Sequence, residues 1–335
     1  MTALLEVRNL SVDIPLAAGM LHPVRDLSFS VDRGETLCIV GESGCGKSLT
    51  SLAIMGLLPK RAVRTAEALS LAGQDLRRAT DAQMAELRGN RMAMIFQEPM
   101  TSLNPAYTIG NQLEEAMLRH RRVSRAEARD RAVYLLERVG ITGARGRLRQ
   151  YPHQLSGGLR QRVMIAMSLM CGPDLIIADE PTTALDVTIQ AQILLLLAEL
   201  QREFRMGLML ITHDLGVVAR IADRVAVMYA GQIVEEGTAE QVFTDPLHPY
   251  TRGLMACIPV PGRTARGAHL GSIPGMVPSL IGDLSGCAFR DRCRHRRPVI
   301  CDEDVGLRRP DEGRGYRCVM TPEESRAEAD RELVA

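Results

Sequence analysis

The sequence predicts an α/β fold with a doubly wound, mainly parallel sheet, an antiparallel β region before it and a small cysteine-containing extension after it. Three observations lead to this prediction. Apolar strands and helices alternate from residue 157 to residue 229, which is the pattern of parallel sheets. A glycine-rich loop joins a predicted strand to a predicted helix at residues 41–48. Beyond Gly237 the alternation gives way to prolines, glycines and cysteines, so a second unit is expected there.

Length and composition fit a globular chain of two parts. With 335 residues, 46% hydrophobic and 24% charged, the chain can bury a large core. We expect a main domain at residues 1–245 and a smaller one at 246–335. The 41 basic and 40 acidic residues give a formal net charge of +1, which provides no overall field for nucleic acid or an acidic membrane. No apolar run reaches about 18 residues, and no secretion signal opens the chain, so we expect a cytosolic protein.

The elements are assigned in chain order. Residues 4–14 and 27–40 are expected to be strands, with breaks at Pro15, Gly19 and Pro23. Residues 48–58 are expected to form a helix, and helical spacing at 110–139 indicates helical hairpins inside an inserted subdomain at about 98–157. The alternating part is assigned as helix 158–171, strand 174–179, helix 187–204, strand 207–212, helix 214–222 and strand 225–229.

The glycine-rich loop carries the strongest functional signal. It consists of Gly41, Glu42, Ser43, Gly44, Cys45, Gly46, Lys47 and Ser48, and Leu49 follows in the next helix. Its spacing matches G-x-x-x-x-G-K-[ST], between a strand and a helix. In such a loop the backbone N–H groups point at phosphate oxygens, the lysine reaches the outer phosphates, and the serine hydroxyl can ligate Mg²⁺. The sequence therefore predicts a nucleoside triphosphate site.

An acidic pair follows the apolar strand at residues 175–178. Asp179 is placed to hold Mg²⁺ through water, and Glu180 to orient and activate an attacking water molecule. An apolar strand that ends in Asp-Glu is common, so the pair alone does not establish hydrolysis. Together with the glycine-rich loop, however, it indicates a hydrolytic site.

A second glycine turn opens the helix that begins near residue 158. It reads Leu155, Ser156, Gly157, Gly158 and offers a second anion site, although one ATP does not need two. With this LSGG sequence the chain resembles the ATP-binding cassette (ABC) family. The resemblance implies a P-loop ATPase fold and a head-to-tail dimer, in which the LSGG signature of one subunit caps the ATP held by the loop of the other.

Further motifs of that family occur in order within residues 4–240. They are Gln97, Asp186 after Ala184 and Leu185, and His213. The resemblance implies that Gln97 senses the γ-phosphate, Mg²⁺ and a membrane partner, and that Asp186 contacts the opposite subunit. It also implies that His213 holds the γ-phosphate and positions Glu180. The catalytic set is then Glu180, His213 and Gln97, and the magnesium ligands are Ser48, Gln97 and Asp179.

Two departures from the family pattern affect the nucleotide site. Leu159 stands where the commonest signature has glutamine, but Ser156 and the two glycines, which face the phosphate, are intact. No aromatic residue lies between Ser11 and Ser28, where many cassettes stack a ring on adenine. His22 is the only planar side chain in that stretch, so the contact to adenine is left open.

Three segments are similar to one branch of the family, the peptide and nickel importer ATPases. They are residues 95–105, residues 158–166 and the run His248, Pro249, Tyr250, Thr251. The resemblance implies that the chain powers import of di- or oligopeptides, with nickel or another small solute as the alternative. It implies four partners: a second, related ATPase subunit, two membrane permeases and an extracytoplasmic solute-binding protein. The chain would then lie at the cytoplasmic face of the inner membrane, attached only through the permeases.

Four cysteines cluster near the C-terminus. Cys287, Cys293, Cys301 and Cys318 have the spacing C-x₅-C-x₇-C-x₁₆-C, unlike the tight pairs of common zinc modules. Some members of this branch carry a [4Fe–4S] cluster on such a set, and that cluster requires four thiolates. The cluster is the first interpretation, with Zn²⁺ and free thiols as alternatives. The other cysteines, Cys38, Cys45, Cys171 and Cys257, are interpreted as ordinary core or loop residues, and the nearby arginines 290, 292, 294, 296 and 297 as a solvated basic face.

Two other functions compete with transport. A soluble cassette ATPase acting on DNA or ribosomes would be expected to carry a long coiled-coil insertion or two cassettes. Residues 49–154 show no sustained heptads and only one set of motifs is present. An iron–sulfur oxidoreductase would need a second cofactor fingerprint, and none is found. ATP hydrolysis that drives solute uptake is therefore the main prediction.

Overall fold

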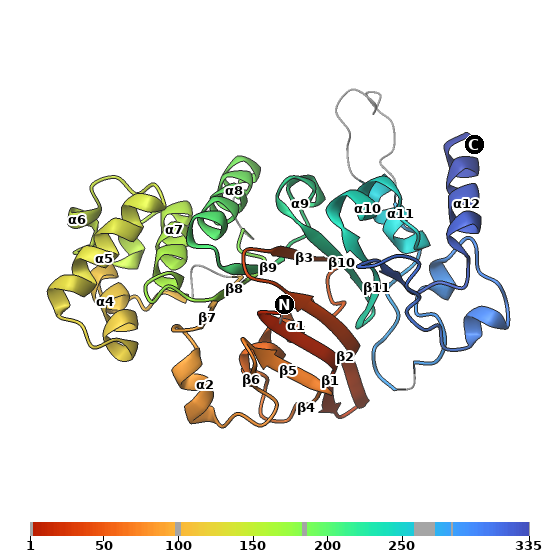
Figure 1. The fold of residues 1–335 in the computed structure, drawn as a ribbon, viewed down its shortest axis with the longest axis horizontal. Helices are drawn as coiled ribbons and strands as arrows, with labels where there is room; N and C mark the ends of the chain where they lie inside the picture. The colour runs from red at the N-terminus through yellow and green to blue at the C-terminus, as the bar shows by residue number, and fades with distance from the viewer. Residues whose placement is uncertain (1–2, 98–101, 183–185, 258–271, 283, 335) are drawn as a thin grey trace.

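The computed structural model describes residues 3–97, 102–182, 186–257, 272–282 and 284–334. Figure 1 shows an elongated molecule with two sheets at its centre, a group of helices at one end and the C-terminal residues at the other. The predicted α/β class, the antiparallel N-terminal region and the inserted helices are confirmed.

The N-terminal region forms an antiparallel sheet in the order β2-β1-β5-β6, with β4 paired to β1. Its strands are β1 (Leu5–Leu16), β2 (Gly19–Val31), β4 (Val63–Thr65), β5 (Ala68–Leu71) and β6 (Gln74–Asp75). The expected breaks at Pro15 and Pro23 are wrong, because both prolines lie inside the β1–β2 hairpin. Pro23 is accommodated on β2, the edge strand of the sheet, where a proline removes no required ladder bond.

The second sheet has the order β12-β11-β10-β3-β9-β8-β7. Its parallel strands are β3 (Thr36–Val40), β7 (Met92–Ile95), β8 (Leu175–Asp179), β9 (Gly207–Ile211) and β10 (Arg224–Tyr229). Two antiparallel strands, β11 (Gln232–Thr238) and β12 (Gly315–Tyr316), extend one edge. The central strands β3, β8 and β9 are buried over their whole length, as in sheets that are covered on both faces.

Alternate residues of the central strands enter two separate cores. Cys38 and Val40 pack into a core with the helices of residues 109–200, whereas Leu37 and Ile39 pack with α1 and the antiparallel sheet. This division follows from the two-residue period of a strand. Helix α1 lies between the two sheets and contacts β1, β2 and β8. The sheet edge that carries the glycine-rich loop is therefore supported from both sides.

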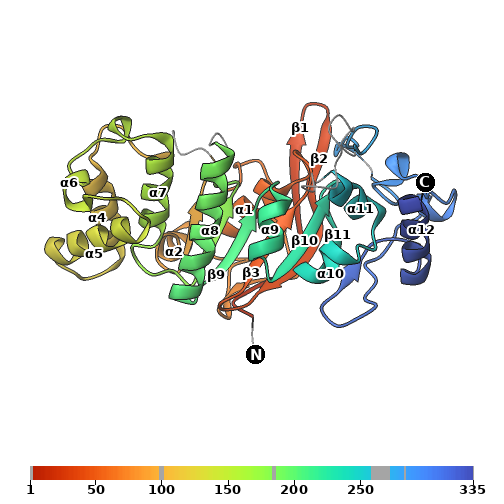
Figure 2. The same ribbon diagram turned by 90° about the horizontal axis from the view of Figure 1, so that it is seen from above.

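The helices fall into three groups, and Figures 1 and 2 show the inserted group at one end of the molecule and the C-terminal group at the other. The first, beside the central sheet, comprises α1 (Lys47–Met55), α2 (Asp81–Leu87), α8 (Val187–Phe204) and α9 (Leu215–Ile221). The inserted group comprises α4 (Ile109–His120), α5 (Arg125–Arg138), α6 (Ala144–Arg147) and α7 (Gly157–Ser168). The C-terminal group comprises α10 (Ala239–Thr244), α11 (Pro249–Ala256) and α12 (Pro322–Val334). Within the described ranges, no helix combines the length and apolar character that a membrane crossing requires.

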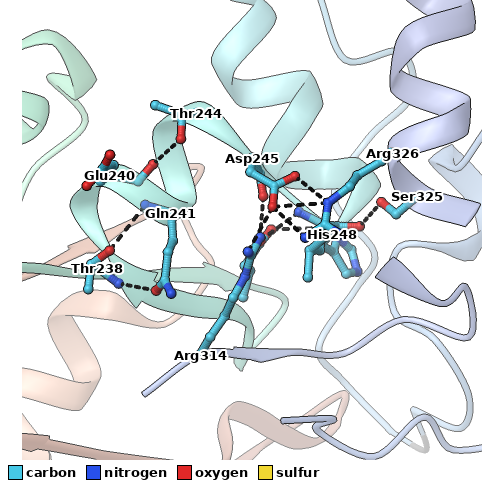
Figure 3. Close-up of polar contacts among 11 residues, drawn as sticks. Thr238, Glu240, Gln241, Thr244, Asp245, His248, Arg314, Ser325 and Arg326 are labelled. Carbon is cyan, nitrogen blue, oxygen red and sulfur yellow. Dashed lines mark hydrogen bonds and ion pairs between the residues drawn. The ribbon is translucent and has the colours of Figure 1, made fainter. Parts of the chain in front are cut away.

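The C-terminal residues are joined to the main sheet by a strand and by arginines. Strand β12 pairs with β11 through Glu235–Tyr316 and Glu236–Gly315. Figure 3 shows Asp245, which follows α10, accepting bonds from Arg314 before β12 and from Arg326 on α12. The Arg314 side chain is only 4% exposed and also lies 3.7 Å from the fully buried carboxylate of Glu235. These contacts hold α12 and β12 against the segment that leaves the sheet.

Candidate active site

Four neighbouring parallel strands carry the predicted catalytic residues at their carboxyl ends. The glycine-rich loop follows β3, His213 lies two residues beyond β9, Asp179 ends β8, and Gln97 lies two residues beyond β7. These strands are consecutive in the sheet order β3-β9-β8-β7. Because carboxyl ends of parallel strands meet at one edge, motifs that are far apart in the sequence come together there.

The glycine-rich loop fits against two strands so closely that two of its glycines cannot carry a side chain. A Cβ added at Gly41 would lie 2.1 Å from the Met228 carbonyl oxygen, and one at Gly46 would lie 1.9 Å from the Pro23 carbonyl oxygen. Both glycines also have positive φ, at 153° and 102°. Strands β10 and β2 therefore fix the loop's path through main-chain contact.

Lys47 lies inside the loop at the start of α1. Its Nζ donates to the carbonyl oxygens of Gly41, at 2.8 Å, and Glu42, at 2.9 Å. Helix α1 has Gly46 as its N-cap, with no side-chain cap and no acidic residue in the first turn. The first N–H groups of this nine-residue helix are therefore not capped by a side chain and suit an anion. The predicted phosphate site therefore combines Lys47 with the uncapped start of α1.

Ser48 and Asp179 form the oxygen pair predicted to hold magnesium. The Ser48 hydroxyl donates to Asp179 Oδ1 at 3.0 Å. Burial raises the pKa of Asp179, the charge of Glu180 adds to this, and the bond from Ser48 opposes it. Hydroxyl and carboxylate oxygens are the ligand types that Mg²⁺ prefers, and a cation would favour the ionised form of the buried Asp179. The pair therefore fits Mg²⁺ chemically.

Two side chains converge on one oxygen of Glu180. Gln97 Nε2 donates to Glu180 Oε2 at 3.2 Å, and His213 Nδ1 lies 3.8 Å from the same atom. Glu180 has a φ of +43°, and its N–H donates to the Ile211 carbonyl oxygen at 2.9 Å. A non-glycine residue held at positive φ is costly and often marks a functional site. The three predicted catalytic residues are therefore adjacent.

The signature residues lie in a different part of the molecule. Ser156 is the N-cap of α7, and its side chain accepts a bond from the Leu159 N–H. Helix α7 packs against α4, α5, α8 and β7, and both ribbon views show it in the inserted helical group, while α1 lies beneath the central sheet. Asp186, the N-cap of α8, is exposed, and Ala184 and Leu185 beside it lie outside the described residues.

His22, the candidate for contact with adenine, is engaged in a pair. Its ring Nδ1 lies 2.5 Å from Asp13 Oδ1. Its backbone N–H donates to the Leu280 carbonyl oxygen at 2.8 Å. The C-terminal extension therefore touches the β1–β2 hairpin. This contact could not be predicted from the sequence, because the two segments are far apart in the chain.

The four C-terminal cysteines line one small cavity together with His248, Phe289 and His295. The Cys287 N–H donates to the Cys301 carbonyl oxygen at 2.9 Å. Burial raises the pKa of Cys287 and of Cys293 to about 11. Among the described residues, no group of three or more His, Cys, Asp or Glu side chains is placed to hold a metal ion. The predicted cysteines thus share a cavity without forming a single-ion site.

Arg252 is a buried cation that sequence reasoning missed, one helical turn after His248, which lines the cavity. Its side chain is 8% exposed, and Nη1 donates to the Ser325 carbonyl oxygen at 2.5 Å. In the structure as described, its Nε and Nη2 have no hydrogen-bond partner. Its charge also acts to lower the pKa of Cys318, against the larger opposite effect of burial. The position is suited to a negatively charged group at the cysteines.

Known families and proteins match almost the whole chain. The family described as "ABC transporter" matches residues 24–183, and "Oligopeptide/dipeptide transporter, C-terminal region" matches residues 234–301. The dipeptide transport ATP-binding protein DppD of Bacillus subtilis (strain 168) is 52% identical over 303 residues, which cover 90% of each chain. The oligopeptide transport ATP-binding protein AppD of the same strain is 47% identical over 97% of this chain and 98% of its own.

Solved structures show the same fold. A dimeric bacterial ABC transporter cassette matches with a TM-score of 0.63 at 26% identity, over 70% of this chain and 98% of the other. A dimeric cassette in a post-hydrolysis state with bound ADP and Pi matches with a TM-score of 0.62 at 25% identity, again over 70% and 98%. The part of this chain that such cassettes leave unmatched amounts to somewhat less than a third.

Proposed function

The chain belongs to the ATP-binding cassette transporter family, and on that basis we propose that it hydrolyses ATP to drive import of di- or oligopeptides through a membrane transporter. The observation that carries this proposal is the meeting of Lys47, Asp179, Glu180 and His213 at one sheet edge. The match of residues 234–301 to the oligopeptide/dipeptide C-terminal region, and relatives described as peptide transport proteins, favour peptides over nickel. The same region argues against an ATPase acting on nucleic acid.

The proposed mechanism assigns each residue one task. The loop N–H groups and Lys47 bind the phosphates. Ser48, Asp179 and Gln97 would hold Mg²⁺, which neutralises negative charge on the phosphates. Glu180 accepts the proton of the attacking water through its carboxylate. Gln97 and His213, which lie 3.2 and 3.8 Å from Glu180 Oε2, fix the direction of that carboxylate.

We propose that a second, related ATPase subunit completes the site. Ser156, Gly157 and Gly158 are placed with the inserted helices, and the exposed Asp186 lies at the start of α8, so each is available to a partner. The matched cassettes are described as dimeric, which supports a pair, and we propose that the two subunits lie head to tail. A heterodimer with a related chain is our proposal for its composition.

We propose that the membrane permeases dock at an apolar groove that includes Phe96. It has a volume of about 330 Å³ and includes Leu57, Ile95, Phe96, Met164 and Met167. The Phe96 side chain stands directly before Gln97 and is 42% exposed, so a group bound there would be next to the catalytic edge. We propose two permeases and an extracytoplasmic solute-binding protein as partners, with this chain peripheral at the cytoplasmic face of the inner membrane. Within the chain, residues 1–245 would act as the nucleotide-binding domain and 246–335 as the extension.

The four cysteines are proposed to hold a [4Fe–4S] cluster. Four thiols on one cavity match the ligand number of that cluster, and the unpartnered N–H groups of Arg252 offer charge compensation. A Zn²⁺ ion needs its ligands around one point, and the described residues offer no such group. When bound, the cluster would crosslink the extension through its cysteine ligands.

Glu180→Gln in the assembled transporter tests the catalytic proposal. We expect ATP to bind as in the wild type and hydrolysis to fall by at least about 100-fold, because removal of a general base or water-orienting group has effects of this order. Glu199→Gln on the exposed face of α8 is the control and should keep normal turnover. Normal hydrolysis by the Glu180→Gln complex would overturn the assignment.

Anaerobic purification followed by iron and acid-labile sulfide analysis tests the cluster. We expect about four iron and four sulfide ions per chain. Cys301→Ser should lose them, whereas the control Cys257→Ser should retain them, because Cys257 is the C-cap of α11 and lies outside the cavity. A colourless, iron-free protein that is fully active would exclude the cluster as a required centre. Zinc in the same preparation would instead support the alternative.

A further inference from the structure

Arg292 in the C-terminal extension binds the glycine-rich loop directly. It ends the 3₁₀ turn Arg290–Arg292 and immediately precedes Cys293. Its Nη1 donates to Glu42 Oε2 at 2.6 Å and its Nη2 to Glu42 Oε1 at 3.0 Å, across 250 residues of sequence. This is the two-pronged pairing in which a guanidinium fixes a carboxylate in direction as well as distance.

The remaining contacts of Arg292 hold it rigidly. Its Nε donates to the Pro274 carbonyl oxygen at 2.9 Å, and Nη2 also donates to that of Ile273 at 3.1 Å. The guanidinium lies over the rings of Tyr229 and Phe289, at 5.7 and 5.9 Å. The side chain is only 6% exposed, so the expectation of a solvated basic face is wrong for this arginine. Backbone carbonyls and aromatic rings bury it there.

Glu42 is held at three points. Besides its carboxylate, its N–H donates to the Tyr250 hydroxyl at 2.9 Å, and its carbonyl oxygen accepts from Lys47 Nζ at 2.9 Å. Tyr250 is fully buried and packs against Tyr229 and Phe289. The second residue of the loop is therefore fixed by two residues from beyond the cassette sheet, and a shift of Glu42 would move an acceptor of Lys47.

We propose that Arg292 is a positioning residue for the phosphate-binding loop, through which the four-cysteine element sets the affinity for ATP. The inference rests on the proposed ATP site. A loop whose N–H groups are already oriented loses less conformational freedom when phosphate binds, so a brace on Glu42 strengthens binding without touching the nucleotide. Cys293 is the next residue, and its N–H donates to the Arg290 carbonyl oxygen at 3.3 Å, so displacement of this cysteine displaces the brace.

Nucleotide affinity of the purified full-length chain tests the proposal. The probes are ADP and a non-hydrolysable ATP analogue, measured by fluorescence competition. Arg292→Gln should weaken both about tenfold, because the loop then has to be ordered by the ligand. Arg292→Lys should give an intermediate loss, since one ammonium cannot reproduce two parallel bonds. Arg294→Gln, on the other side of Cys293 and exposed, is the matched control and should bind as the wild type.

Glu42→Gln distinguishes the loss of loop positioning from the loss of a negative charge near the phosphates. It leaves the aromatic residues around Arg292 unchanged. Removing a negative charge near the phosphates would by itself tighten nucleotide binding, whereas loss of the brace weakens it. We expect several-fold weaker binding, with little added loss in the double variant Glu42→Gln/Arg292→Gln. Cys293→Ser should weaken binding several-fold and add little to Arg292→Gln.

The results distinguish failure of the positioning role of Arg292 from failure of the proposed ATP site. Wild-type affinity in Arg292→Gln, tighter binding in Glu42→Gln, or full additivity of the two losses would each overturn the positioning role. A wild-type protein that binds neither probe would instead count against the proposed ATP site.

Discussion

The glycine-rich loop and the C-terminal extension are held in place by opposite means. In the loop the decisive contacts belong to the main chain: Gly41 and Gly46 lie against carbonyl groups of neighbouring strands, and Lys47 closes the turn onto loop carbonyls. In the extension, arginine side chains serve this purpose. Arg25, on β2, donates to the Leu284 carbonyl oxygen at 2.6 Å. Arg252 donates to the carbonyl oxygen of Ser325 at 2.5 Å, and Arg317 donates to that of Val305 at 2.9 Å.

The difference follows from secondary structure. The loop lies between a buried strand and a helix, and its carbonyl groups have nearby donors: the Cys45 carbonyl oxygen accepts from the Gly231 N–H at 3.0 Å, and those of Gly41 and Glu42 accept from Lys47. The described extension between α11 and α12 contains only two short 3₁₀ turns and the two-residue strand β12, so many carbonyls have no ladder partner. A buried carbonyl needs a donor, and a guanidinium offers five in a fixed fork. The comparison teaches that irregular chain can be ordered when arginines replace the missing backbone ladder.

Gly46→Ala breaks the main-chain side of this comparison and should have the largest effect. A methyl group 1.9 Å from the Pro23 carbonyl oxygen forces the loop or β2 to move, at a cost of about 4 kcal/mol when overpacking and left-handed strain are combined. We expect nucleotide binding to be lost in titrations and the melting temperature to fall. Gly44→Ala is the control, since its φ is also positive but nothing lies within 4 Å; it should cost about 1 kcal/mol. Equal effects would show that strain alone limits the loop.

The fold and the catalytic residues of the cassette could be predicted from the sequence, because the motifs that indicate them are local. Glycine spacing at 41–48, an apolar strand ending in Asp179 and the alternation after residue 157 each reflect chemistry within a few residues. Parallel pairing of those strands then brings Glu180 and His213 together at one edge. The breaks predicted at the prolines of the β1–β2 hairpin are wrong because proline usually ends a strand, whereas an edge strand accommodates it.

The extension could not be predicted to the same depth, because its contacts are non-local. Nothing near Arg292 in the sequence indicates a carboxylate in the glycine-rich loop, and nothing near Arg252 indicates that its charge acts on Cys318. Strand β12 has two residues, too few for a periodicity. The spacing of the cysteines suggested one site, but only the folded chain shows that all four line the same cavity.

Arg314→Gln tests the arginine side of the comparison. Arg314 is 4% exposed and binds Asp245 at 2.9 Å while lying 3.7 Å from the buried Glu235. Removing one partner of a buried pair is strongly destabilising, and because Asp245 is partly exposed we expect about 2 kcal/mol. Denaturant titration and limited proteolysis should show that the extension loosens first. Arg326→Gln, which binds the same Asp245 from a half-exposed position, should cost less than about 1 kcal/mol. Equal losses would contradict the importance of burial.

His248→Asn should have the smallest effect at neutral pH, and it sharpens the comparison when the pH is varied. His248 caps α11, with its Nδ1 accepting from the Tyr250 N–H at 3.0 Å, and asparagine can supply a similar acceptor. Burial, with the charge of Arg252, lowers the pKa of His248 from 6.5 to about 3. Between these values the unfolded chain binds a proton that the folded chain does not, so stability is lost as the pH falls from 6.5 towards 3.

The histidine therefore gives the wild type a slope of up to about 1.4 kcal/mol per pH unit that the asparagine variant lacks. Unfolding titrations of both proteins between pH 7 and 4.5 would measure it. Burial raises the pKa of Glu235, whose carboxylate accepts a bond from the backbone N–H of His248 at 2.9 Å, and this change in pKa alters stability with pH in the opposite direction. Because both proteins retain Glu235, the difference between their slopes isolates residue 248. Identical slopes would mean that the pKa of His248 is the same in the folded and the unfolded chain, which would contradict its lowering by burial.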